Sequence, residues 1–209
     1  MSKTCLPYHI GMFISCFWLL NGCSERNQEN DNCDTVFVST DSPTQIEDLN
    51  PLKQNVIRYY FSTLKKTSID FELLTSHSDF FNASVDYKTI ENDPLERRYL
   101  IKVNHALFTN NAPGLGVAAI LVHEIKHILD YTTYAMDDFI GFGLWYATSD
   151  VRDYERATDE FALSVGCATG LKQYRQWLYE HVPASALLEK KRNYYTPEEI
   201  DTWVLEHSE

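Results

Sequence analysis

The sequence predicts an α+β domain with a small β-sheet in its first half and a largely helical second half. Between residues 69 and 103, three short runs rich in β-branched and aromatic residues are separated by turn-forming residues. After residue 113, apolar residues recur at the spacing of helix faces. The 209 residues are 44% hydrophobic and include 13 Tyr, 11 Phe and 4 Trp, which is enough for one sizeable core.

The charge balance argues against two classes of partner. The chain has 18 Lys and Arg against 30 Asp and Glu, a formal net charge of -12. Binding to a nucleic-acid backbone draws on clustered basic side chains, so we expect no nucleic-acid partner. The same shortage of Lys and Arg argues against electrostatic binding to an anionic membrane.

The first 22 residues have the pattern of an export signal. Lys3 precedes an apolar stretch over 10–20, which at about 11 residues is too short for a membrane-spanning helix of about 20. The stretch ends in Leu20-Asn21-Gly22-Cys23, which resembles the bacterial lipobox, whose Cys receives a lipid after cleavage. We therefore predict a lipoprotein signal over 1–22. An ordinary secretory signal with an incidental Cys23 is the alternative.

A lipid on Cys23 would anchor the protein to the bacterial cell envelope, because each buried methylene contributes about 0.8 kcal/mol. The segment that follows is polar, so 23–35 is predicted to be a flexible tether and 36–209 a single folded domain. Ser24 directly after the lipidated Cys favours the outer membrane. The oligomeric state does not follow from the sequence.

Two cysteines of the mature chain remain, Cys33 and Cys167. In an oxidising compartment they could form one disulfide, which would tie the N-terminal segment to the helix that carries Cys167. Two independent thiols are the alternative, with Cys167 a small core residue. The sequence leaves both open.

The first half of the domain is predicted to combine strands with one helix. Asn50 can cap a helix and Pro51 suits its first turn, and apolar residues continue at helical spacing to about Lys66. The segments with strand character are 36–38, 69–74, 83–87 and 99–103.

The second half is predicted to be helical. A run of turn-forming residues over 110–114 separates it from the strands. Thr196 and Glu199 form a capping box around Pro197, which marks the start of the last helix. The aromatic-rich segment 137–154 receives no assignment. The predicted helices are 115–132, 151–182 with an interruption near Gly166 or Gly170, 184–192 and 197–206.

A possible metal site begins with His123-Glu124-Ile125-Lys126-His127, an HExxH motif inside the apolar helix. Four residues make about one helical turn, so both imidazoles project from the same face and can chelate one ion. Glu124 lies about 100° round the helix, where its carboxylate reaches water beside the metal rather than the metal itself. Neutral imidazoles and an open tetrahedral site suit Zn²⁺.

A second motif, Glu155-Arg156-Ala157-Thr158-Asp159, follows on the next predicted helix. Glu155 can supply the third protein ligand. Asp159, one turn further on, can accept the free ring N–H of His123 and so fix its tautomer. Glu160 is the rival carboxylate, and Asp150 and Asp153 are weaker rivals.

Together the two motifs resemble the gluzincin arrangement of zinc metallopeptidases. The flanks AAILVHEIKHILD and DYERATDEFAL are similar to the HtpX-like peptidases, and the second is also similar to the ImmA/IrrE-like group. The resemblance covers about 99–169. It implies a zincin-like fold, with a small sheet packed on the HExxH helix. It also implies His123, His127 and Glu155 as zinc ligands and Glu124 as general base. Asp159 would then contact a ligand rather than the zinc ion itself.

The resemblance further implies an edge strand just before the HExxH helix that pairs with an extended peptide substrate, and 99–103 fits that place. The HtpX-like enzymes carry transmembrane helices, whose place a lipid anchor would take in this chain.

The predicted function is therefore zinc-dependent hydrolysis of peptide bonds in the cell envelope by water that the metal activates, with Glu124 as general base. A donor must also stabilise the oxyanion that forms, and the sequence does not single it out. The candidates are Tyr131, Tyr134, Tyr154, Arg175 and His181. The alternatives are a non-catalytic binding or inhibitor lipoprotein with a metallopeptidase-like fold, and a structural lipoprotein with a coincidental HExxH.

Overall fold

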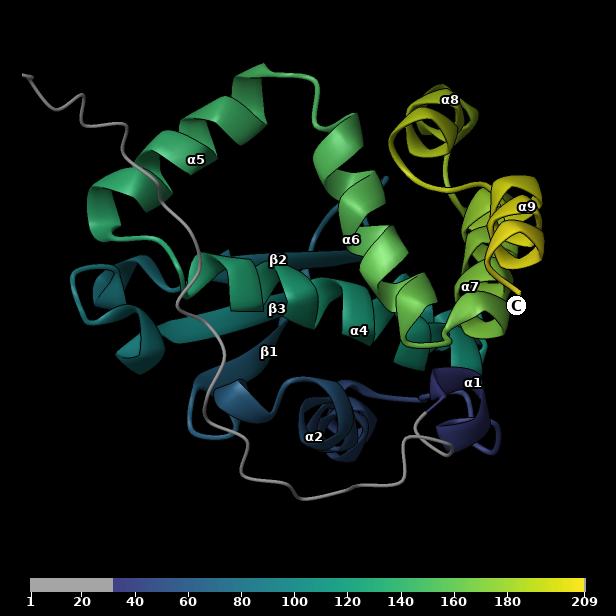
Figure 1. Ribbon diagram of the computed structural model, residues 1–209, viewed down its shortest axis with the longest axis horizontal. Coiled ribbons are helices and arrows are strands. Elements are labelled where there is room, and N and C mark those ends of the chain that lie inside the picture. The colour runs from purple at the N-terminus through teal and green to yellow at the C-terminus, as the bar shows by residue number, and fades with distance from the viewer. Residues whose placement is uncertain (1–31, 209) are drawn as a thin grey trace, which may run out of the picture.

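The computed structural model describes residues 32–208 and confirms a mixed α+β architecture (Figure 1). The predicted export signal, Cys23 and the tether up to residue 31 lie outside the described residues. The strands are β1 (Ser68–Leu74), β2 (Phe81–Val85) and β3 (Arg98–Asn104). The α-helices are α1 (Cys33–Val36), α2 (Leu49–Tyr60), α3 (Ala106–Thr109), α4 (Gly114–Tyr131), α5 (Met136–Thr148), α6 (Arg152–Ser164), α7 (Ala168–His181), α8 (Ala184–Asn193) and α9 (Pro197–His207).

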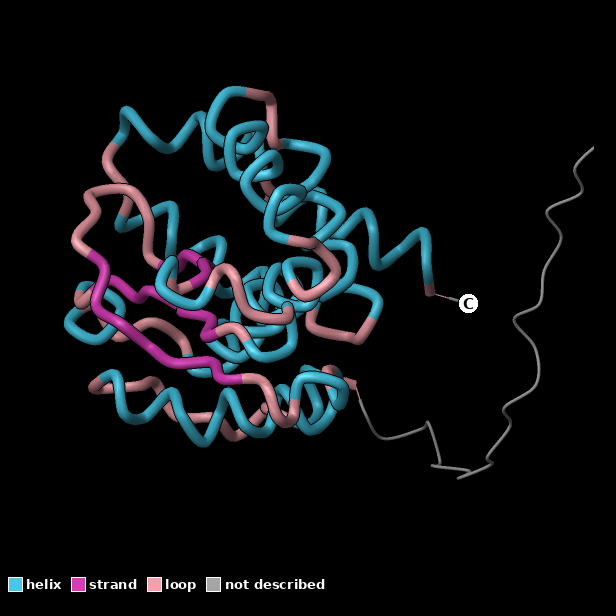
Figure 2. Tube along the Cα trace, turned by 90° about the vertical axis from the view of Figure 1, so that its left-hand side faces the viewer, coloured by secondary structure: helices cyan, strands magenta, loops and turns pink. Residues whose placement is uncertain are grey.

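The three strands form one sheet in the order β1-β3-β2, with most of the helices gathered on one side of it (Figure 2). β1 runs parallel to β3, and β2 runs antiparallel to it. The strand predicted over 99–103 is therefore central, and its prediction as the substrate-binding edge is wrong. Its residues Tyr99, Leu100 and Ile101 are buried one after another, as expected of a strand covered on both faces.

α4 is the central helix of the domain. Of its 18 residues, most are buried, because α2, α6, α7 and β2 all pack against it. A helix that is apolar on nearly every side requires such an environment. No helix among residues 32–208 is both long and apolar enough to cross a bilayer.

The N-terminal segment differs from the prediction. The strand expected over 36–38 is absent, and α1 and a turn replace it. The side chain of Asn32 caps α1 by accepting from Thr35 N, and Cys33 forms a disulfide with Cys167. Residues 32–35, predicted to be the end of the tether, therefore belong to the folded domain.

Two further boundaries shift. The helix expected to reach Lys66 ends at Tyr60, because Phe61 leaves the helical conformation at φ -130° and ψ 50°. The strand expected over 83–87 is displaced to β2, and Tyr87 lies in a 3-10 turn that the side chain of Asp86 caps.

The long helix predicted over 151–182 is two helices, α6 and α7. Gly166 separates them with φ +82°, a conformation that favours glycine, and a Cβ there would also meet the Asn32 side chain. The last helix begins as predicted: Thr196 accepts from Glu199 N, and Glu199 accepts from Thr196 N.

The unassigned segment forms α5, which stands apart at the upper left of Figure 1. None of its residues is buried. Its inward aromatic side chains still contact one another and the end of α4, since the ring centroids of Phe139 and Tyr131 lie 5.2 Å apart. α5 thus forms one wall beside the buried face of α4.

Candidate metal centre

Three polar side chains of α4 are buried together. His123, Glu124 and His127 expose 1%, 6% and 5% of their surfaces. The two histidines are one turn apart on the helix, so their rings extend from the same face, as the sequence predicts. Burying such groups is costly unless they find partners, so the neighbours of these side chains determine what the site can do.

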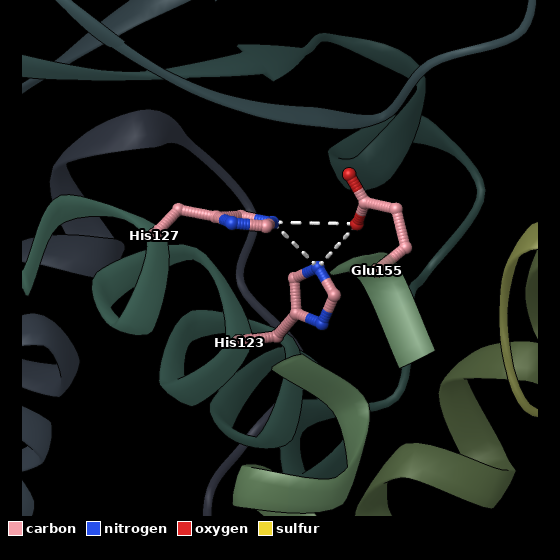
Figure 3. A group of neighbouring side chains, drawn as sticks. All are labelled: His123, His127 and Glu155. Atoms are coloured by element: carbon pink, nitrogen blue, oxygen red, sulfur yellow. Dashed lines mark hydrogen bonds and ion pairs between the residues drawn. The ribbon is translucent and has the colours of Figure 1, made fainter. Parts of the chain in front are cut away.

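Glu155 on α6 completes a group of three possible ligands (Figure 3). Its Oε2 atom lies 3.2 Å from Nε2 of His123 and 3.3 Å from Nε2 of His127. The two Nε2 atoms are 3.0 Å apart. The three atoms form a nearly equilateral triangle, and this buried group could hold a metal ion.

Each of the three side chains makes a further hydrogen bond on the side away from the triangle. Nδ1 of His123 lies 2.8 Å from Oδ1 of Asp159, and Nδ1 of His127 lies 3.0 Å from the Tyr154 hydroxyl. The Tyr146 hydroxyl donates to Oε1 of Glu155. With each Nδ1 as the donor, both Nε2 lone pairs are directed towards the centre, which is the arrangement that metal ligation needs.

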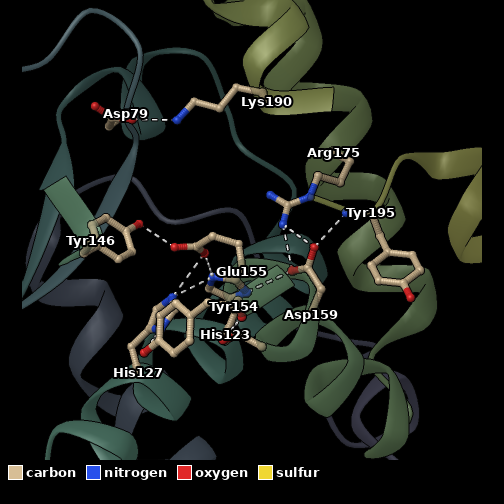
Figure 4. A network of polar contacts seen from close by, with 11 residues as sticks. Asp79, His123, His127, Tyr146, Tyr154, Glu155, Asp159, Arg175, Lys190 and Tyr195 are labelled. Atoms are coloured by element: carbon tan, nitrogen blue, oxygen red, sulfur yellow. Dashed lines mark hydrogen bonds and ion pairs between the residues drawn. The ribbon is translucent and has the colours of Figure 1, made fainter. Parts of the chain in front are cut away.

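Asp159 connects the ligand group to the C-terminal helices (Figure 4). It is fully buried and accepts two hydrogen bonds from Arg175 Nη2, at 2.8 and 3.0 Å, besides the one from His123. Its Oδ2 also accepts from the backbone N–H of Tyr195 at 3.0 Å. The predicted role of Asp159 behind His123 therefore matches the geometry, and Arg175 neutralises the carboxylate.

The electrostatics of the group favour a positive charge at its centre. Burial opposes protonation of His123, but hydrogen bonds to Asp159 and Glu155 outweigh it and raise its pKa to about 10. Burial would raise the pKa of Glu155, but the hydrogen bonds with His123 and His127 hold it well below its ordinary value. A divalent cation would supply the positive charge that these groups favour.

A cavity of about 330 Å³ opens beside the triangle. Glu124 faces it, and burial raises the pKa of this carboxyl, an effect that the neighbouring histidines and a hydrogen bond from the Ala83 backbone partly offset. The other lining residues come from the neighbouring elements: Asp79, Phe81, Asn82, Ala83, Ser84, Val85, His127, Tyr131, Phe139, Phe142, Gly143, Tyr146, Glu155 and Tyr194.

β2, the edge strand, presents part of its backbone to this cavity. Asn104 N donates to Phe80 O and Asp86 N donates to Arg98 O, which fixes the alternation of the antiparallel ladder. By that alternation, the backbone groups of Ala83 are directed away from β3. The Ala83 N–H donates to Glu124, so its carbonyl is the group that remains available to a strand added at this edge.

The rival carboxylates lie elsewhere. Glu160 accepts from the Tyr195 hydroxyl on the surface. Asp150 lies 3.9 Å from Arg192, and Asp153 pairs with its neighbour Arg152. Glu155 alone among the carboxylates weighed as third ligand joins the two histidines.

Of the five candidate oxyanion donors, Tyr131 alone is among the residues that line the cavity. Tyr154 is engaged with His127, Arg175 is tied to Asp159, and His181 donates to the backbone oxygen of Trp177. Tyr134 stacks on Phe142 and is not among the lining residues.

Two tyrosines at the site had not been singled out from the motifs. Tyr146 binds Glu155 from α5, and Tyr194, just after α8, lines the cavity from the C-terminal side. Neither lies near HExxH or ExxxD in the sequence, and tyrosine is common in this chain, so no local signal identified them.

Comparisons of the chain with protein-family models, curated proteins and solved structures gave no match. The functional argument therefore rests on the chemistry of the site itself.

Proposed function

We infer that this protein is a zinc-dependent endopeptidase of the bacterial cell envelope. The observation that carries the inference is the convergence of His123, His127 and Glu155 on one point, with Glu124 beside it in an open cavity. A binding site for a structural metal would need a fourth side chain to close it, whereas three ligands and an adjacent cavity leave room for water and substrate.

The dimensions of the triangle suit zinc. Tetrahedral zinc bonds of about 2.0–2.1 Å put neighbouring ligand atoms about 3.3 Å apart. The separations among His123, His127 and Glu155 are 3.0, 3.2 and 3.3 Å. Two imidazoles and one carboxylate are also a common donor set of catalytic zinc. The hydrogen bonds that the two rings donate to Asp159 and Tyr154 support this assignment, because such partners orient ligands and raise their basicity.

Glu124 is proposed as the general base. A bound zinc ion would polarise the scissile carbonyl and make a water molecule more acidic. Glu124 then takes the proton of the attacking water and later passes it to the leaving amine. The raised pKa of its buried carboxyl supports this role, because a base works best when its pKa approaches the working pH.

The substrate is proposed to be an extended peptide that adds to β2. The Ala83 carbonyl lies on the open edge of the strand, and the Ala83 N–H on the same edge donates to Glu124. Main-chain hydrogen bonds of this kind give affinity without sequence specificity. Selectivity would come from the opposite wall, where Phe139 and Phe142 favour an apolar side chain.

The envelope location rests on two features. The Leu20-Asn21-Gly22-Cys23 pattern supports a lipid anchor, with Ser24 favouring the outer membrane. The Cys33–Cys167 disulfide supports an oxidising compartment. Membrane contact would then run through the lipid on Cys23.

The decisive variant is Glu124→Gln, which keeps the shape of the side chain and removes its basicity. We expect zinc content and fold to be unchanged and cleavage of a fluorogenic peptide library to be lost. In the wild type, a zinc chelator should abolish cleavage and added zinc should restore it. Full activity of Glu124→Gln would contradict the general-base role. A wild type that binds zinc and peptides without cleaving any would instead be a binding lipoprotein.

A further inference from the structure

Tyr194 occupies a defined place between the ligand group and the C-terminal helices. Its ring centroid lies 5.9 Å from that of His123, and the Arg175 guanidinium lies 4.5 Å from the ring on the C-terminal side. The residue lines the cavity of about 330 Å³ beside the ligand triangle, together with Glu124 and Glu155. It also lines a second cavity of about 30 Å³ with His123, Glu124 and Arg175. Tyr194 therefore lies between His123 and Arg175 and lines both cavities.

The hydroxyl of Tyr194 is available as a donor. Within residues 32–208 this hydroxyl makes no hydrogen bond. Tyr146 lines the same cavity, but its hydroxyl donates to Glu155. The Tyr154 hydroxyl accepts from Nδ1 of His127, and Tyr154 is not among the residues that line the cavity. Among the tyrosines that line the cavity, only Tyr131 shares the free hydroxyl of Tyr194 within the described part of the chain.

Tyr131 and Tyr194 differ in their surroundings. Tyr131 lies on the same helix as Glu124, the proposed base, and stacks on His127. Tyr194 comes from another element and contacts His123, the other histidine. In a tetrahedral centre the attacking oxygen and the oxyanion are different atoms, so the base and the oxyanion donor need separate positions. Tyr194 supplies the second position.

Tyr194 is also held firmly. The next residue, Tyr195, donates its backbone N–H to Asp159, which binds His123 and Arg175 as well. The guanidinium against the ring restrains the ring and draws electron density from it. A donor fixed before the reaction stabilises developing charge without reorganisation.

We propose that the Tyr194 hydroxyl donates a hydrogen bond to the oxyanion that forms when water adds to the scissile carbonyl. The proposal rests on the proposed peptidase function and adds a residue to it. No bond to Tyr194 forms or breaks, and its proton stays on the hydroxyl. Arg175 acts as a positioning residue behind it.

The test is Tyr194→Phe, which keeps the ring against Arg175 and removes only the hydroxyl. The probes are N-phosphoryl-Leu-Trp, whose phosphoryl group mimics the tetrahedral centre, and mercaptoacetyl-Leu-Trp, which ligates zinc through sulfur and presents no oxyanion. With the zinc-loaded protein, we expect affinity for the phosphoryl ligand to fall about 100-fold and kcat to fall about 100-fold to 1,000-fold. Affinity for the thiol ligand and KM should change less than about threefold.

Two control variants accompany it. Tyr87→Phe removes a hydroxyl from a side chain that is 75% exposed and should bind both probes as the wild type does. Tyr131→Phe tests the rival donor. Unchanged phosphoryl affinity in Tyr194→Phe, an equal loss for both probes, or the selective loss in Tyr131→Phe instead would overturn the proposal.

The outcomes also separate this proposal from the peptidase function. A wild type that binds the phosphoryl ligand in a Tyr194-dependent way but cleaves no peptide would refute the enzyme and keep the oxyanion contact. A zinc-loaded wild type that binds neither probe would overturn both.

Discussion

Asp159→Asn tests whether the buried carboxylate behind His123 organises the site. The substitution keeps the shape of the side chain but removes its charge and places an amide NH₂ among groups that are themselves donors. Arg175, which is 2% exposed, would lose its ionic partner. Removing one member of a buried ion pair costs about 3–5 kcal/mol, so we expect a loss of this size in the free energy of unfolding.

A second effect of Asp159→Asn is separable from the first. His123 loses the carboxylate that accepts its Nδ1–H at 2.8 Å, so zinc affinity should fall about 10-fold to 100-fold. Urea unfolding in the presence of a chelator measures the stability, and competition with a chromogenic chelator measures the affinity. Adding Arg175→Met should restore part of the stability, because the unpaired cation is gone, but not the zinc affinity.

Glu160→Gln is the matched control, since this neighbouring carboxylate is exposed and accepts only from the Tyr195 hydroxyl. It should lower stability by no more than about 1 kcal/mol. If Asp159→Asn proved as stable as Glu160→Gln, or bound zinc as tightly as the wild type, the argument for an organising carboxylate would be wrong.

Three further predictions follow from other contacts. Replacing both Cys33 and Cys167 by Ala should lower the free energy of unfolding by up to about 5 kcal/mol, because the disulfide spans 134 residues; a loss in urea unfolding below about 1 kcal/mol would contradict this. Partial burial of Glu199 would raise its pKa, but Arg156 at 3.0 and 3.1 Å and the Thr196 backbone lower it below the ordinary value. Its contribution is therefore complete above about pH 4.3 and is lost as the pH falls through the lowered pKa, so the stability difference between wild type and Glu199→Gln should shrink in acid; a difference that grows there would refute the sign. Phe142→Ala should reduce the preference for cleaving peptides with large apolar side chains by about 10-fold or more, while zinc content stays constant. An unchanged peptide-library profile would show that α5 does not determine specificity.

The ligand group could be predicted because its spacing is local. His123 and His127 are one helical turn apart, and so are Glu155 and Asp159, so each motif needs only a helix to place its members. An interruption near Gly166 or Gly170 and the start of the last helix at Thr196 were also predicted, because both depend on local residue types; the structure places the break at Gly166.

The features that could not be predicted depend on tertiary contacts. Val36 and Phe37 have β-forming side chains, but the Cys33 disulfide and the Asn32 cap hold the segment in α1 and a turn. The expectation that 99–103 is an edge strand came from the resemblance, which places such a strand just before the HExxH helix; here that strand is β3, which pairs with both β1 and β2.

α5 and Tyr194 show a second limit. α5 is apolar on several faces and contains two glycines, so no single periodic face identifies it as a helix. Tyr194 reaches the site from the segment after α8, and the residue that follows it is bound by Asp159, 36 positions earlier in the chain.

The most direct test of the metal centre is a zinc measurement on the purified protein combined with zinc X-ray absorption. The account predicts about one zinc per chain, bound by two imidazole nitrogens and one carboxylate oxygen at about 2.0–2.2 Å. Separate His123→Ala, His127→Ala and Glu155→Ala variants should each lose the ion. Zinc retained in those variants, or a wild type that binds no divalent metal at neutral pH, would contradict the account.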